Sequence, residues 1–177
     1  FMLKEIFEEP EALRNTFLGS LMPKSGEVIL GIEAEMGARL KNINRIIFCG
    51  CGTAYLAGLY GKYIAEDFLG IEAKVELASE FRYQNPVVGP NDLFVVVSQS
   101  GETADTLAAL RLAKERGALT LGIVNVVGST ISRETDGGIF NHIGPEIGVA
   151  STKALLSQMG VVNLLVLMIA KYHQIKL

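Results

Sequence analysis

Five short apolar runs alternate with longer amphipathic stretches along the chain. The runs are rich in Val, Ile and Leu and show little polar alternation, which is typical of parallel strands covered on both faces. Strands and helices that alternate at this spacing predict right-handed βαβ crossovers, and therefore an α/β fold with a doubly wound parallel sheet. The predicted strands are residues 45–49, 73–78, 93–97, 118–125 and 138–143.

The first quarter of the chain shows a weaker pattern. Residues 1–44 predict a helical segment, with one helix that begins near Pro10, where proline is tolerated in the first turn, and a second helix at 26–42. Residues 45–177 hold the sheet and its flanking helices. Because the sequence contains no internal repeat, low-complexity tract or linker, residues 1–177 are interpreted as a single domain.

The last predicted helix, residues 153–172, is apolar on nearly all sides. Its length approaches that of a membrane span, but Ser157, Gln158 and Gly160 interrupt it and no basic cluster flanks it. A core or interface helix is therefore preferred, and no membrane association is expected. Because one small sheet cannot cover such a helix, the sequence predicts a homodimer, or pairing with a second domain, through part of residues 154–169.

Composition narrows the choice of partners. The 177 residues are 49% hydrophobic and 20% charged with a formal net charge of −3, which disfavours disorder and a broad basic face for nucleic acid. A small phosphorylated molecule, held by local donors, fits this charge. Cys49 and Cys51 are too close for an ordinary disulfide and lack further metal ligands. We therefore expect reduced thiols, no metal site and a cytoplasmic location.

The stretch LFVVVSQSGETADT, residues 93–106, joins a buried strand to a helix through a turn rich in hydroxyls. Ser98 and Ser100 lie in this turn, and Thr103 and Thr106 are predicted to cap the helix with their hydroxyls. The first amides of a helix lack partners and the helix dipole is positive there, so these donors and hydroxyls predict an anion site. The alternative is that the hydroxyls only cap the helix.

A second loop, residues 49–54, also follows a predicted strand. It is no dinucleotide fingerprint, because Tyr55 stands where the third glycine or alanine should be. Gly50 and Gly52 still allow close approach of backbone to a ligand, and Thr53 can cap the helix. A tight turn without a ligand is the alternative. Since the carboxyl ends of parallel strands share one edge, this loop and the Ser98 turn are expected to face one crevice.

The third polar loop is NHIGPEIGVASTK, residues 141–153. Ser151 and Thr152 are predicted to cap the last helix, and Glu146 and Lys153 carry opposite charges. This loop either contacts polar groups of a ligand or holds a capped helix and a solvated ion pair. His142 and His173 have no partner in the sequence, so neither is expected to act as a general base.

Three of these motifs together resemble the sugar isomerase (SIS) domain family: CGTA at 51–54, SQSGETADT at 98–106 and EIGVASTK at 146–153. With KEIFEEPEALRNT at 4–16 and ASEFRY at 78–83, the chain is similar to the first of two SIS domains in the glucosamine-6-phosphate synthase family. This resemblance implies a three-layer α/β/α domain with a five-stranded parallel sheet.

The resemblance also implies a set of ligand-binding residues. Ala54 is a departure, since the family commonly has Ser there, with one more hydroxyl for the phosphate. The implied phosphate-binding residues are Ser98, Gln99, Ser100 and Thr103. The implied sugar-binding residues are Cys51, Gly52, Thr53, Val149, Ala150 and Ser151.

By resemblance, the ligand is a sugar phosphate, fructose 6-phosphate or glucosamine 6-phosphate, and no cofactor is needed. The family's glutaminase domain and its second SIS domain, which carries the acid/base residues and a Schiff-base lysine, have no counterpart in this sequence. We therefore expect binding without catalysis, and Glu146 is the one candidate considered for a catalytic carboxylate. The alternatives are a stand-alone phosphosugar isomerase with a single SIS domain and a regulatory module that binds sugar phosphates.

Overall fold

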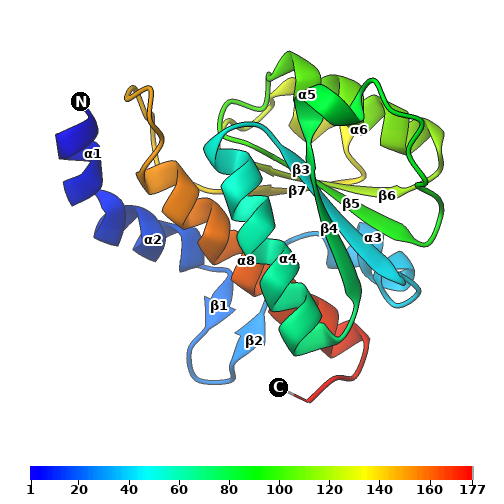
Figure 1. Ribbon diagram of the computed structural model, residues 1–177. Coiled ribbons are helices and arrows are strands. Elements are labelled where there is room, and N and C mark those ends of the chain that lie inside the picture. The colour runs from blue at the N-terminus through cyan, green and yellow to red at the C-terminus, as the bar shows by residue number, and fades with distance from the viewer. Residues whose placement is uncertain (177) are drawn as a thin grey trace.

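The five predicted strands form one sheet in the computed structural model, which describes residues 1–176 (Figure 1). All neighbouring strands are parallel, and their order is β4-β3-β5-β6-β7. The predicted α/β fold with a five-stranded parallel sheet is thus confirmed. The strands are β3 (Arg45–Gly50), β4 (Glu72–Leu77), β5 (Asp92–Ser98), β6 (Leu119–Val124) and β7 (Gly137–Phe140).

Helices cover both faces of this sheet and give the three layers (Figure 1). Alternate residues of the central strand divide between the faces, because side chains along a strand point to opposite sides. Val95 packs in the larger core with α3, α4 and α8, whereas Phe94 and Val96 pack in the smaller core with α5, α6 and α7. The helices are α3 (Glu33–Leu40), α4 (Thr53–Leu69), α5 (Ala78–Phe81), α6 (Ala104–Glu115), α7 (Thr130–Glu134) and α8 (Lys153–Tyr172).

The N-terminal segment is less helical than predicted. Pro10 lies in the first turn of a helix, as expected, but the predicted helix at 26–42 is wrong in its first half. That half contains one strand of a short antiparallel hairpin, and helix begins only at Glu33. Strands of two residues are too short to show an alternating pattern. The elements here are α1 (Met2–Phe7), α2 (Glu9–Phe17), β1 (Leu21–Met22) and β2 (Glu27–Val28).

Helix α8 is covered from within the chain. Of the helices in residues 1–176, it is the one with the length and composition of a membrane span, yet 72% of its most apolar stretch is buried inside the domain. It packs on α4 and α2 as well as on the sheet, and Leu167 is its one large apolar side chain that stays exposed. The core-helix interpretation is therefore confirmed. The predicted interface through part of residues 154–169 stays a prediction, and α2 and α4 supply much of the cover of this helix from within the chain.

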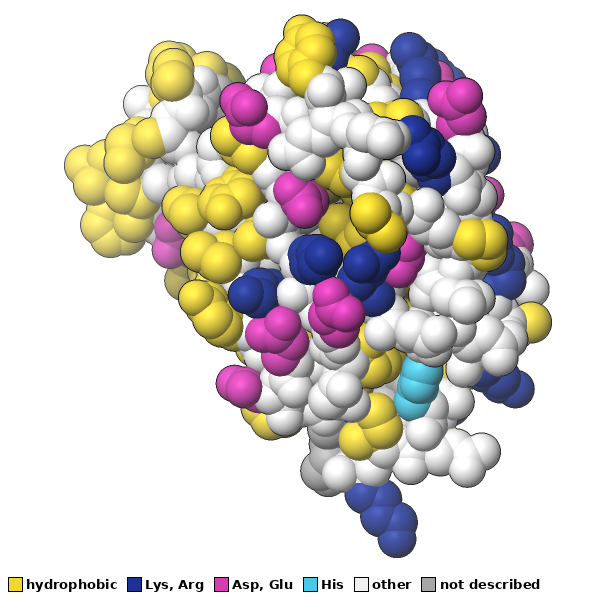
Figure 2. Space-filling view, turned by 45° about the vertical axis from the view of Figure 1, so that its right-hand side comes forward, with side chains coloured by type: hydrophobic (Ala, Val, Ile, Leu, Met, Phe, Trp, Pro, Cys, Tyr) yellow, Lys and Arg dark blue, Asp and Glu magenta, His cyan; other side chains and the backbone are white. Residues whose placement is uncertain are grey.

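Surface charges agree with the charge balance of the sequence. On the face shown in Figure 2, Lys and Arg side chains are interspersed with Asp and Glu side chains. Charged side chains of the chain also form ion pairs, such as that of Arg111 with Glu134 at 2.6 Å. This face therefore has no broad basic surface of the kind that binds nucleic acid.

Candidate functional site

The loops after β3 and β5 meet at the point where the strand order reverses. From β3 the chain crosses to β4 on one side, and it then returns to place β5 on the other side of β3. Ligand sites of doubly wound sheets lie at such switch points. Here the two loops border a cleft of about 220 Å³. It is lined by Cys51, Thr53, Ala54, Val97, Ser98, Gln99, Ser100, Thr103, Ser151 and Gln158.

Hydroxyl groups hold the turn after β5 in shape. Ser98 Oγ accepts a hydrogen bond from the Gly101 amide at 3.1 Å and lies 3.0 Å from Thr103 Oγ1. Ser100 Oγ accepts from the Glu102 amide at 3.2 Å. Gly101 has φ of +67°, a conformation that side chains with a Cβ rarely adopt. The turn is thus ordered before any ligand arrives, with Ser98, Ser100 and Thr103 on the wall of the cleft.

Two helices begin at this cleft without a side-chain cap in the described part of the chain. Gly52 and Thr103 occupy the N-cap positions of α4 and α6, and neither helix has a capping hydrogen bond from a side chain. The predicted caps by Thr53, Thr103 and Thr106 were wrong. Thr53 lies within the first turn of α4, Thr103 pairs with Ser98, and the Thr106 hydroxyl is buried without a partner in residues 1–176. The first amides of both helices therefore remain available to an anion.

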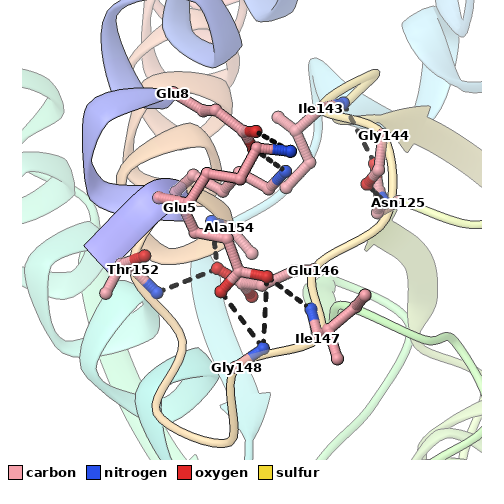
Figure 3. A network of polar contacts seen from close by, with 12 residues as sticks. Glu5, Glu8, Asn125, Ile143, Gly144, Glu146, Ile147, Gly148, Thr152 and Ala154 are labelled. Atoms are coloured by element: carbon pink, nitrogen blue, oxygen red, sulfur yellow. Dashed lines mark hydrogen bonds and ion pairs between the residues drawn. The ribbon is translucent and has the colours of Figure 1, made fainter. Parts of the chain in front are cut away.

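Glu146 caps the N-terminus of α8. Its carboxylate accepts hydrogen bonds from Ser151 Oγ at 2.8 Å, from the Thr152 amide at 2.9 Å and from the Ala154 amide at 3.2 Å (Figure 3). The predicted capping by the hydroxyls of Ser151 and Thr152 was therefore wrong. A carboxylate at this position is favoured by the helix dipole. Since Glu146 is engaged here and does not line the cleft, the geometry gives it a structural role.

Lys153 pairs with Glu8 and not, as the sequence suggested, with Glu146. Its Nζ lies 2.8 Å from Glu8 Oε2, and the Lys153 side chain is only 4% exposed. This ion pair lowers the pKa of Glu8, chiefly through the hydrogen bond from Lys153. A cavity of about 480 Å³ lies between the 141–153 loop and helices α1 and α2, with both residues in its wall. The loop is thus tied to the N-terminal segment.

The structure brings most of the predicted site residues together. Cys51, Thr53, Ser98, Gln99, Ser100, Thr103 and Ser151 all line the cleft. Gly52, Val149 and Ala150 do not: Gly52 begins α4, while Val149 and Ala150 are exposed on the loop that leads to Ser151.

Val97 and Gln158 were missed by sequence reasoning. Val97 belongs to the buried end of β5. Gln158 is buried on α8 with its Oε1 atom unpaired within residues 1–176. The signal for Gln158 in the sequence was an amide side chain within a helix of mostly apolar residues.

The cysteines are free thiols in the structure. Cys49 is buried in β3, and burial raises the pKa of its thiol, whereas Cys51 lies on the wall of the cleft. Among residues 1–176, no three His, Cys, Asp or Glu side chains come together as metal ligands. His173 instead lies 2.9 Å from the Leu40 carbonyl, at the end of α8. The described polar side chains that line the cleft carry hydroxyls, amides and the Cys51 thiol.

Residues 39–168 match the SIS domain family. With the sheet order and the switch-point cleft described above, this match shows that the chain belongs to the SIS domain family. Within that family it is homologous to the isomerase region of glutamine–fructose-6-phosphate aminotransferase. It is 54% identical over 171 residues to that enzyme from Chlorobaculum tepidum and 48% identical over 171 residues to that from Bacteroides thetaiotaomicron, covering 97% of this chain in each case.

The solved structures agree with this assignment. The C-terminal domain of glucosamine-fructose-6-phosphate aminotransferase from Francisella tularensis matches with a TM-score of 0.91 and 42% sequence identity, covering 98% of this chain and 48% of that chain. This chain spans 28% of the length of the two curated aminotransferases. It therefore corresponds to one part of a longer protein in these relatives.

Proposed function

We propose that the cleft between β3 and β5 binds a phosphorylated sugar, fructose 6-phosphate or glucosamine 6-phosphate. One observation carries this proposal: two helices, α4 and α6, begin at the cleft without side-chain caps, beside the hydroxyls of Ser98, Ser100 and Thr103. Amides at helix N-termini and hydroxyls together suit the phosphate oxygens. Among residues 1–176, no Lys or Arg lines the cleft, so these neutral donors are the groups that would hold the charge.

Calorimetric titration tests this proposal directly. Fructose 6-phosphate is the ligand, and fructose at the same concentration is the control for the phosphate. We expect saturable binding of the phosphorylated sugar and none of fructose, since the proposed donors act on the phosphate. Equal binding of both sugars, or of neither, would contradict the proposal.

For the longer protein, we propose the isomerising transfer of ammonia from glutamine to fructose 6-phosphate. The relatives that are 54% and 48% identical to this chain are named for this activity. In this proposal the chain is the first of two SIS domains, pairs with the second or with another copy of itself, and works in the cytoplasm. Sedimentation of the chain as a monomer at micromolar concentrations would contradict pairing between copies.

The chain by itself is expected to bind without catalysing. Moving a proton between neighbouring sugar carbons needs a base within about 3 Å of the proton's path. Glu146 already accepts three hydrogen bonds at the start of α8, away from the cleft wall. We expect no conversion of fructose 6-phosphate to glucose 6-phosphate, or to glucosamine 6-phosphate with added ammonia, in a coupled assay. Robust turnover that is lost in Glu146→Gln would instead support a stand-alone isomerase.

Replacing Ala54 with serine is expected to tighten sugar-phosphate binding by roughly tenfold, because a hydrogen bond to a charged group contributes about 1.5–3 kcal/mol. Ala54 lies in the first turn of α4 and lines the cleft, so the new hydroxyl would face the proposed phosphate position. Titration with fructose 6-phosphate measures the gain. Ala54→Val adds bulk without a hydroxyl and is the matched control. A tighter complex in the valine variant would show that the hydroxyl is not the cause.

A further inference from the structure

A buried carboxylate on helix α1 accepts hydrogen bonds from the loop that leads to Ser151. Glu5 is 4% exposed, and within α1 it is the buried residue. Its Oε1 atom accepts a hydrogen bond from the Ile147 amide at 2.6 Å, and both of its oxygens accept from the Gly148 amide, at 3.1 and 3.2 Å (Figure 3). These hydrogen bonds, that from Ile147 above all, lower the pKa of Glu5. Glu5 is therefore held as a carboxylate against the loop.

The loop is shaped to receive this carboxylate. A Cβ atom at Gly148 would lie 2.5 Å from Glu5 Oε2, so any larger residue would push against the oxygen. The carboxylate has little room to yield, because it is buried and the consecutive amides of Ile147 and Gly148 hold its oxygens. The absence of a side chain at Gly148 and the burial of Glu5 are separate observations. Both indicate a close contact between α1 and the loop.

This contact lies at one end of the segment that the proposed function assigns to the sugar. Val149 follows Gly148 directly, and Ser151 lies on the wall of the cleft. Glu146 holds the other end, through Ser151 Oγ and the first amides of α8. The segment is thus held at one end by the carboxylate of Glu5 and at the other by that of Glu146. Glu5 comes from a helix more than 140 residues earlier in the chain.

We propose that Glu5 is a positioning residue, which fixes the Val149–Ser151 segment at the distance from the cleft that a bound sugar needs. The inference rests on the proposed function, because it assumes that this segment contacts the sugar. Loops that carry contact residues need such support from hydrogen bonds behind them to keep their geometry. The Ser98 turn, where the phosphate is proposed to bind, lines the cleft, whereas Glu5 does not. Loss of Glu5 should therefore affect the sugar and spare the phosphate.

The experiment compares two ligands on the same variants. The wild type, Glu5→Ala and Gly148→Ala are each titrated with fructose 6-phosphate and with inorganic phosphate. Amide hydrogen exchange at residues 147 and 148 is measured by NMR in parallel. Glu11→Ala is the matched control, because Glu11 lines the same cavity as Glu5, is exposed, and its side chain has no hydrogen bond or ion pair with residues 1–176.

In Glu5→Ala we expect fructose 6-phosphate affinity to fall by roughly tenfold, because the Ile147 and Gly148 amides lose the acceptor that fixes the Val149–Ser151 segment, while phosphate affinity changes by less than about twofold. Exchange at residues 147 and 148 should rise. Gly148→Ala should show the same split between ligands, because it displaces the carboxylate from the other side. Glu11→Ala should leave all three measurements unchanged.

Equal losses of both ligands in a folded Glu5→Ala protein would overturn the proposal, as would unchanged affinities despite faster exchange. If Glu5→Ala does not fold, the ligand affinities of Gly148→Ala test the proposal instead. If neither variant folds, the contact has a purely structural role and the proposal is overturned. If the wild type binds neither ligand, the proposed function itself is contradicted. The exchange data then report separately whether Glu5 holds the loop, and unchanged exchange would overturn that part too.

Discussion

Replacing Ser100 and Thr103 together with alanine is expected to weaken fructose 6-phosphate binding by at least about a hundredfold, because each hydrogen bond to a charged group contributes about 1.5–3 kcal/mol. Both hydroxyls line the cleft at the start of α6. Titration calorimetry measures the loss. Thermal unfolding should shift only modestly, because the hydrogen bonds of Ser100 and Thr103 within the turn are lost but the Ser98 hydroxyl still accepts from the Gly101 amide.

The matched control removes the same two kinds of hydroxyl away from the cleft. Ser132 Oγ donates to the Ser129 carbonyl and Thr135 Oγ1 donates to the Ile131 carbonyl, both at helix α7. The double variant Ser132→Ala/Thr135→Ala should bind fructose 6-phosphate like the wild type. If the Ser100→Ala/Thr103→Ala protein is folded and keeps its affinity, the phosphate does not bind at this turn.

Replacing Gly101 with alanine is expected to destabilise the protein by about 2–6 kcal/mol, which combines a strained backbone with an overpacked contact. Gly101 has φ of +67°, and a Cβ there would lie 2.5 Å from Ser129 Cβ and closer still to Ser129 Oγ. Thermal unfolding gives the loss of stability. The turn carries Ser98 and Ser100, so fructose 6-phosphate binding should be lost as well.

Two further variants separate the cost of backbone strain at Gly101 from the cost of the close contact with Ser129. Gly128 has φ of +75° and nothing within 4 Å of its Cβ position, so Gly128→Ala should show the backbone cost alone, about 1–3 kcal/mol. Adding Ser129→Gly to Gly101→Ala removes the atoms that the new Cβ would meet and should restore part of the stability. Equal destabilisation by Gly101→Ala and Gly128→Ala would show that the close contact with Ser129 has no cost.

The sequence by itself was sufficient for the sheet and for most of the cleft. Each strand is a short apolar run that can be recognised locally, and all five predicted runs became strands of one parallel sheet. The two glycine- and hydroxyl-bearing loops could be placed together because parallel strands end at one edge. Ser98 is the last residue of β5 and Gly101 lies three residues after it, so their roles in the turn have a local signature.

The tertiary structure decided which charged groups meet and what covers α8. Glu5 binds the amide of Ile147, and Glu8 pairs with Lys153 across 145 positions of sequence. A carboxylate can accept from any donor within reach, so no local pattern shows which donor the fold brings to it. The local sequence likewise does not show which partner buries a given apolar surface. The apolar surface of α8 indicated that the helix needs cover, but whether α2 and α4 or another protein supplies it depends on contacts that exist only once the chain has folded.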